Sequence, residues 1–393
     1  MGRAGKVLVS LTAWTVLAGG SVFVAFVLFE WMMQMARQGT VAMRVTPAPY
    51  GVFDEDLGVR YEPGTSISYA YLDSKGRVLE CMPEISRTNP DGFRGLDTQR
   101  DYQEAEQRVL VSGDSFSHWN IAGYTLVDYT KAELEEQGHA ASLLNVAGGT
   151  FGLEHMVVHL AAAIEEVDAP TPDLVAIQFI RDDITRGWWH LDTIEDDRGR
   201  PRARLGRSVE CLAPDSNCGS DEYLIEQRAT QEWCESQKGS GTVDAVGADL
   251  AETYRNIRGF FVYVPRAFAR LGIIDRQSTS VIPRVVSIEK IDTDRILRAI
   301  ESIKASGARI VFVYLPTSEE ILSRQIYTFD EHENAVLRFY EKHLGVPVAF
   351  PSDYSAFDGV SELAVSPFDS HPSAELQRAY GRYLADRFST ELR

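Results

Sequence analysis

The sequence predicts an α/β fold, a parallel sheet with helices on both faces, preceded by one N-terminal transmembrane helix. Three observations predict it: an uncharged apolar run near the N-terminus, a strand and helix alternation that starts at Arg108, and predicted strands that are apolar throughout. Strands covered on both faces read as continuous apolar runs, whereas a sheet with one wet face alternates apolar and polar residues.

The run Val7–Phe29 carries no charged residue. As a helix it would be about 34 Å long, at about 1.5 Å per residue, which is enough to span a bilayer. A cleaved signal peptide has a shorter apolar stretch with a small-residue site after it, so an uncleaved anchor is favoured. Arg3 and Lys6 precede the run, while Arg37 and Arg44 follow it. This small positive-inside bias predicts a main domain outside the cytoplasm, periplasmic or extracellular.

Three parts follow from these patterns. Residues 1–36 are expected to be the anchor, and 37–107, with short alternating runs such as SISYAYL, a small β-containing lead-in. Residues 108–393 are expected to form the α/β domain, interrupted at about 184–289 by a polar insertion. Connections of that length are uncommon in a compact domain unless they have a use.

Within the α/β domain, apolar runs of strand length alternate with longer stretches of helical character. We expect strands at 108–113, 141–147, 173–180, 308–316 and 346–350, and helices at 123–137, 152–167, 292–307, 330–345 and 372–388.

Charge and cysteine content exclude some classes and leave others open. The net charge of −18 argues against a nucleic-acid partner, because phosphate binding needs clustered Lys and Arg. Cys81, Cys211, Cys218 and Cys234 suit two disulfides in an oxidising compartment, with Cys211–Cys218 the favoured pair; four unpaired thiols remain an equal alternative. There is no CxxC, P-loop, GxGxxG or HExxH motif, so neither a metal nor a nucleotide cofactor is predicted.

Ser115 follows the first core strand directly, in RVLVSGDSFSHW. Ligands of open α/β sheets collect at the carboxyl ends of the strands, so its hydroxyl is expected in that crevice. A serine nucleophile needs a base held by a carboxylate, and the best placed pair is His371 and Asp369, in a loop directly before the final helix. The alternative is that Asp369 or Ser370 only caps that helix.

Four segments resemble, in order, the sequence blocks of the SGNH (GDSL-type) hydrolase superfamily. They are GDSFS at 113–117, NVAGGTFG at 145–152, QFIRDDI at 178–184 and DSH at 369–371. The upstream RTNPDGFRG at 87–95 is similar to a segment that often precedes the serine block in membrane-anchored and secreted members. The resemblance covers about Arg87 to Phe388, with a gap at the insertion. It implies a flavodoxin-like three-layer α/β/α sandwich and acyl-ester chemistry without a metal.

By block position, the resemblance implies Ser115 as nucleophile, His371 as base and Asp369 as its orienting carboxylate. It implies oxyanion donors at the backbone N–H of Ser115 and of a glycine that we place at Gly149. The third block of the family adds an asparagine amide, but this chain has Asp182 there. An ionised carboxylate donates no hydrogen bond, so the alternatives are a protonated Asp182, another donor from the loop, an impaired site, or a loop in which Asp182 only faces solvent.

Further side chains near these blocks have two interpretations each. His118 and Trp119 suit either an acyl or sugar pocket or ordinary packing, and Arg181, Trp188 and Trp189 either a carbohydrate platform or an interface. The helical neighbours Glu154, His155 and His159 match no metal geometry.

Two function hypotheses follow. The first is a membrane-anchored, extracytoplasmic serine esterase or O-acyltransferase of SGNH type that acts on acyl esters, with a glycan as a reasonable substrate. The second is a catalytically impaired SGNH-fold scaffold or accessory subunit of a membrane protein complex, which the aspartate at 182, the insertion and the single anchor favour.

Overall fold

A five-stranded parallel sheet lies at the centre of the chain. The structure is a computed structural model that describes residues 41–45, 51–52, 54–72, 78–167, 171–188, 191–195, 201–205, 292–365 and 371–393. The strand order is β12 (Val348–Ala349), β11 (Arg309–Tyr314), β8 (Leu174–Phe179), β6 (Gln107–Ser112) and β7 (Ala141–Asn145), with every neighbouring pair parallel. Numbered along the chain from β6, this is the flavodoxin-like order 2-1-3-4-5.

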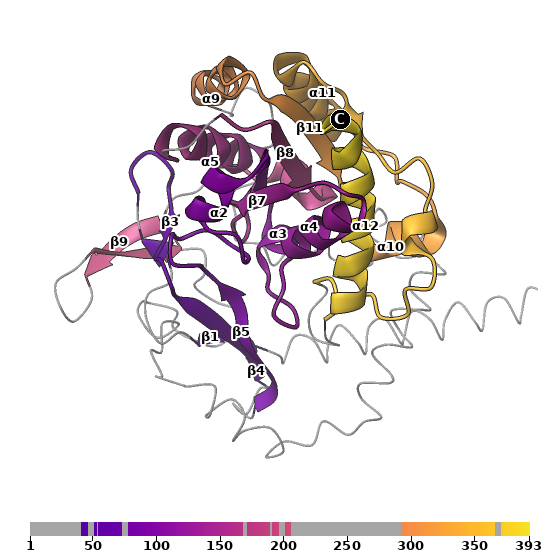
Figure 1. Cartoon of the computed structure of the whole chain (residues 1–393). Coiled ribbons are helices and arrows are strands. Elements are labelled where there is room, and N and C mark those ends of the chain that lie inside the picture. Colours follow the sequence, from indigo (N-terminus) through magenta and orange to yellow (C-terminus); the bar gives the residue numbers. More distant parts are fainter. Residues whose placement is uncertain are drawn as a thin grey trace, which may run out of the picture.

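Helices cover both faces of this sheet (Figure 1). On one face lie α4 (Leu126–Glu136) and α12 (Ala374–Glu391), and on the other α5 (Leu153–Glu166), α9 (Thr293–Ala305) and α11 (Glu331–Leu344). Val109 and Val111 of β6 pack toward α4 and α12, whereas Leu110 between them packs into the core on the other face. Both faces are apolar, so the predicted α/β fold with a parallel sheet is confirmed.

The connections between these elements contain short helices. They are α2 (Gln99–Glu104), α3 (Ser115–His118), α10 (Ser318–Ser323) and the 3₁₀ helices η1 (Arg181–Thr185) and η5 (Ser355–Phe357). Two of them, α3 and η1, directly follow the carboxyl ends of β6 and β8, where ligand sites of this fold form.

The lead-in contains strands, as its alternating runs predict. An antiparallel sheet joins β1 (Val41–Val45), β4 (Ser66–Leu72) and β5 (Val78–Arg87), and β2 (Gly51–Val52) pairs with β3 (Arg60–Tyr61). Ile67, Met82 and Ile85 of the sheet pack against Trp119 and Ile121, which follow α3. The lead-in therefore supports the chain next to Ser115.

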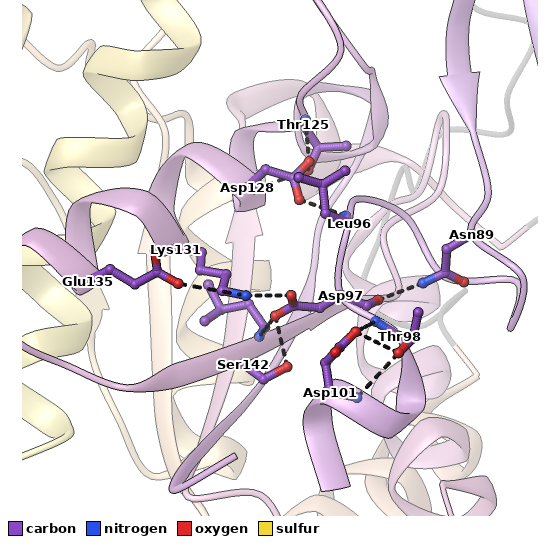
Figure 2. A network of polar contacts seen from close by, with 11 residues as sticks. Asn89, Leu96, Asp97, Thr98, Asp101, Thr125, Asp128, Lys131, Glu135 and Ser142 are labelled. Carbon is purple, nitrogen blue, oxygen red and sulfur yellow. Dashed lines mark hydrogen bonds and ion pairs between the residues drawn. The ribbon is translucent and has the colours of Figure 1, made fainter. Parts of the chain in front are cut away.

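After β5, the lead-in covers the outer edge of β7, which the sequence did not predict. The N–H of Arg94 donates to the carbonyl of Asn145 (2.9 Å), and the N–H of Leu143 donates to Asp97 Oδ2 (2.8 Å). Asp97 Oδ2 also accepts from the Ser142 hydroxyl, and its Oδ1 lies 2.6 Å from Lys131 Nζ on α4 (Figure 2). An open strand edge is a template for aggregation, and these contacts close it.

Several predictions fall on residues outside the described ranges. They are the anchor Val7–Phe29, Asp369, Trp189 and the three cysteines of the insertion. Within the insertion, the structure describes the paired strands β9 (Leu191–Glu195) and β10 (Pro201–Leu205). A search of the described part of the chain for a helix long and apolar enough to cross a membrane finds none.

Candidate active site

Ser115 is the first residue of α3, just past β6. Asp114 caps this helix, because its Oδ1 accepts from the N–H of Phe116 at 2.9 Å. Gly113 precedes it, and a Cβ there would overlap the Ser117 hydroxyl and lie 3.1 Å from the carbonyl oxygen of Gln178 on β8. The glycine thus lets the chain pass close to the neighbouring strand, and the turn places Ser115 at the carboxyl edge of the sheet.

His371 meets Ser115 across 256 positions of sequence. Its Nε2 lies 2.7 Å from Ser115 Oγ. The imidazole stacks on Trp119, with ring centroids 3.6 Å apart and planes at 13°. The backbone carbonyl of His371 accepts from the N–H of Val365 at 2.7 Å. Packing on one side and a backbone hydrogen bond on the other hold the ring toward the serine, at the distance at which a base takes a proton.

The glycine loop after β7 lies against the serine turn. The N–H of Gly148 donates to the carbonyl of Gly113 at 3.1 Å, and Thr150 has a φ of +68°, unusual for a residue with a Cβ. A Cβ at Gly148 would overlap the ring of Phe151, so a glycine is needed there to keep the loop close. Gly149 is half-buried in this loop, and its role as an oxyanion donor stays a prediction.

The two aspartates of the third block have different surroundings. Asp182 is exposed, whereas Asp183 is fully buried and its Oδ2 accepts from the N–H of Ile180 at 2.8 Å. Burial, together with the nearby charge of Asp114, raises the pKa of Asp183 well above its ordinary value, although Arg186 opposes this. Arg186 pairs with Asp183 and lies 3.3 Å from Asp114 Oδ2. The carboxyl group that is buried next to the serine turn is therefore Asp183, and the role predicted for Asp182 remains a prediction.

A second buried network lies behind α3. Arg94, which is 1% exposed, donates through Nε to His118 Nδ1 at 2.8 Å, and its guanidinium lies 3.6 Å above the ring of Tyr61. Since arginine can only donate, Nδ1 is an acceptor and the proton of a neutral His118 lies on Nε2, which faces the Ser86 hydroxyl. His118 is thus buried among protein groups, and Arg94 of the RTNPDGFRG segment fixes its tautomer.

Other candidate residues have structural partners. Arg181 pairs with Glu333 on α11. Trp188 stacks on His155, with ring centroids 4.3 Å apart, and lies under Arg295. Among the residues that the structure describes, no group of three or more His, Cys, Asp or Glu is arranged to hold a metal ion.

Glu154 at the start of α5 yields a stability prediction. It is 4% exposed and lies 3.7 Å from Arg295 Nη1, and burial raises its pKa to about 7 from the ordinary 4.5, although Arg295 opposes this. Between these two pH values the folded chain holds a proton that the unfolded chain has lost. The stabilisation is complete below about pH 4.5 and is lost as the pH rises through about 7, roughly 3 kcal/mol in all.

The measurement is urea unfolding of the parent and Glu154→Gln across this pH window. The free energy of unfolding of the parent should fall relative to that of the variant as pH rises. The difference between the two proteins is needed because burial lowers the pKa of His159 to about 4, which gives the parent an opposing slope. A difference that does not change with pH would contradict the prediction.

Comparisons with known proteins add little to this geometry. No protein-family model matches the chain, and a search of curated proteins finds no match. Among solved structures, the chain is similar to the lipase/acylhydrolase from Enterococcus faecalis, with 11% identity and a TM-score of 0.33, over 73% of this chain and 97% of that chain. A similarity this low carries no argument about the reaction.

Proposed function

We propose that this chain is a membrane-anchored serine esterase or O-acyltransferase of SGNH type, with its catalytic domain outside the cytoplasm and no cofactor. The observation that carries the proposal is the 2.7 Å distance between Ser115 Oγ and His371 Nε2. A serine hydroxyl becomes a nucleophile when a base lies within hydrogen-bond reach. The apolar run Val7–Phe29 and the even set of cysteines support the location.

The reaction follows from these positions. Ser115 Oγ attacks the ester carbonyl carbon while its proton passes to His371 Nε2. The N–H groups of Ser115 and Gly149 donate hydrogen bonds to the oxyanion that forms. The first N–H groups of a helix have no acceptor within it, so that of Ser115 is available for this role. Collapse of the tetrahedral intermediate expels the alcohol, which takes the proton from His371. Water or a sugar hydroxyl then gives its proton to His371 and attacks the acyl-enzyme, and Ser115 leaves with that proton. We propose acyl esters of a glycan as the substrate class.

One observation favours the second candidate, an impaired SGNH-fold scaffold or accessory subunit of a membrane complex. Asp182, at the position of the family's asparagine, has an exposed carboxylate that donates no hydrogen bond when ionised. Loss of one oxyanion donor typically lowers the rate about 10²- to 10³-fold.

A fluorophosphonate probe distinguishes the two candidates. The full-length chain in detergent is incubated with the probe beside Ser115→Ala and Asp182→Asn, and the adduct is located by mass spectrometry. Labelling of the parent on the peptide that contains Ser115, lost in Ser115→Ala and in heat-unfolded parent, supports the enzyme. An inert parent with a reactive Asp182→Asn would instead support the scaffold.

A further inference from the structure

The oxyanion hole implied by the resemblance lacks a side-chain donor at position 182. The nucleophile, its base and the two backbone donors all have counterparts in this chain, so the missing group is the amide of the third block. Asp182 is exposed, and an ionised carboxylate only accepts hydrogen bonds. A cation or a donor from elsewhere would be needed to complete the hole.

Arg186, at the end of η1, lies where the three blocks meet. Its Nη1 is 3.3 Å from Asp114 Oδ2 in the serine turn and 3.4 Å from the carbonyl oxygen of Phe151 in the glycine loop, and it also contacts Asp183 of the third block. Asp114 Oδ2 in turn lies 3.4 Å from Ser115 Oγ, so one carboxylate oxygen separates the guanidinium from the nucleophile.

Gly152 leaves room for the backbone of Arg186 beside the glycine loop. A Cβ at Gly152 would overlap the carbonyl oxygen of Arg186 and lie 2.8 Å from its Cβ, so only glycine lets the end of η1 approach α5 this closely. The backbone of Arg186 is therefore fixed by packing against the glycine loop.

Part of the guanidinium remains uncommitted. All three contacts are made by Nη1, and neither Nε nor Nη2 has a hydrogen-bond partner among the residues that the structure describes. The side chain is 15% exposed, beside two carboxyl groups that are almost fully buried. Burial and the charge of Asp114 raise the pKa of Asp183, although the charge of Arg186 opposes this.

We propose that the guanidinium of Arg186 replaces the missing amide and stabilises the oxyanion that forms when Ser115 attacks an ester. The inference rests on the proposed function. It gives the third block a working residue four positions after Asp182, and Asp182 then has no part in the reaction.

The experiment uses the full-length chain with two readouts, phosphonylation of Ser115 by the fluorophosphonate and hydrolysis of p-nitrophenyl acetate. Arg186→Gln is compared with the double variant Asp183→Asn/Arg186→Gln, in which the buried carboxyl is neutralised together with its partner. Removal of one partner of a buried pair strongly destabilises a protein, whereas removal of both is often tolerated, so the double variant separates folding from catalysis. Arg181→Gln is the matched control, since Arg181 lies on the same short helix and pairs with Glu333.

We expect phosphonylation and kcat of the double variant to fall about 10²- to 10³-fold, with KM within about threefold of the parent, because the interaction forms mainly in the transition state. Arg181→Gln should stay within about threefold of the parent, and Asp182→Asn should not gain rate, because Arg186 already supplies the third donor. A folded double variant that reacts like the parent, or a gain of about tenfold or more in Asp182→Asn, would overturn the inference while the proposed function stands. A parent that neither labels nor hydrolyses would end both.

Discussion

Replacement of His371 by glutamine is expected to reduce ester turnover by about 10⁴- to 10⁶-fold, because it removes the group that takes the proton from Ser115. Glutamine keeps a polar side chain of similar reach, so packing against Trp119 changes little, but an amide is not a base at neutral pH. The measurement is kcat for p-nitrophenyl acetate, together with the rate of phosphonylation.

Two further variants show whether His371 acts together with Ser115. Residues of one catalytic unit have non-additive effects, so Ser115→Ala/His371→Gln should be no slower than Ser115→Ala alone. The matched control is His139→Gln. That histidine lies before β7 and its Nδ1 contacts Gln107 Oε1 at 3.1 Å, so its loss should change kcat less than about twofold. Additive losses, or a His371→Gln variant with a tenth of the parent's rate, would contradict the assignment.

The sheet could be predicted because its signal is local. Val109, Leu110 and Val111 are consecutive apolar residues, and a strand covered on both faces needs such a run, since neighbouring side chains enter opposite cores. The proximity of Ser115 and His371 also followed from the sequence, because Ser115 directly follows a core strand and His371 lies in the connection after the last one.

The surroundings of Asp182 and Asp183 were out of reach for the same reasoning. Successive residues of a 3₁₀ helix point about 120° apart, so one of two adjacent aspartates is buried and the other faces solvent, with no periodic signal to say which. The partner of Arg181 is Glu333, 152 positions away, and the neighbouring Asp182 plays no part in that pair. Arg186 follows the matched block, and the only sequence signal for its role is its position three and four residues after two aspartates on one short helical segment.

The contacts of the lead-in with the edge of β7 could not be predicted from the sequence, because they depend on polar residues of a loop. In RTNPDGFRG, Asn89 Oδ1 accepts from the N–H groups of Asp91 and Phe93, and Gly92 has a φ of +89°, so the segment folds into a turn that the Asn and Gly could have indicated. Nothing in the local sequence indicates that this turn leads to the edge of a strand some 50 residues later along the chain.

This cover of β7 leads to a large expected change in stability. Asp97→Ala is expected to lower the free energy of unfolding by about 3 kcal/mol, because it removes the acceptor that three polar groups share. Those groups are the ammonium of Lys131 (2.6 Å), the hydroxyl of Ser142 (2.8 Å) and the N–H of Leu143 (2.8 Å). Although burial opposes it, the hydrogen bond to Asp97 raises the pKa of Lys131, so the pair is bound more tightly in its charged form.

Urea unfolding of three further variants separates the contribution of the ion pair with Lys131 from that of the hydrogen bonds that cover β7. Glu135→Ala is the matched control, because Glu135 lies 3.7 Å from the same Lys131 Nζ but is 57% exposed, so its loss should cost less than about 1 kcal/mol. Asp97→Asn retains an acceptor oxygen for Leu143 or Ser142 and should lie between the two. Asp97→Asn/Lys131→Met removes both charges, and should be more stable than Asp97→Asn alone if an unpaired ammonium is the main cost. An Asp97→Ala midpoint equal to that of Glu135→Ala would mean that Asp97 contributes no more to stability than an exposed ion pair.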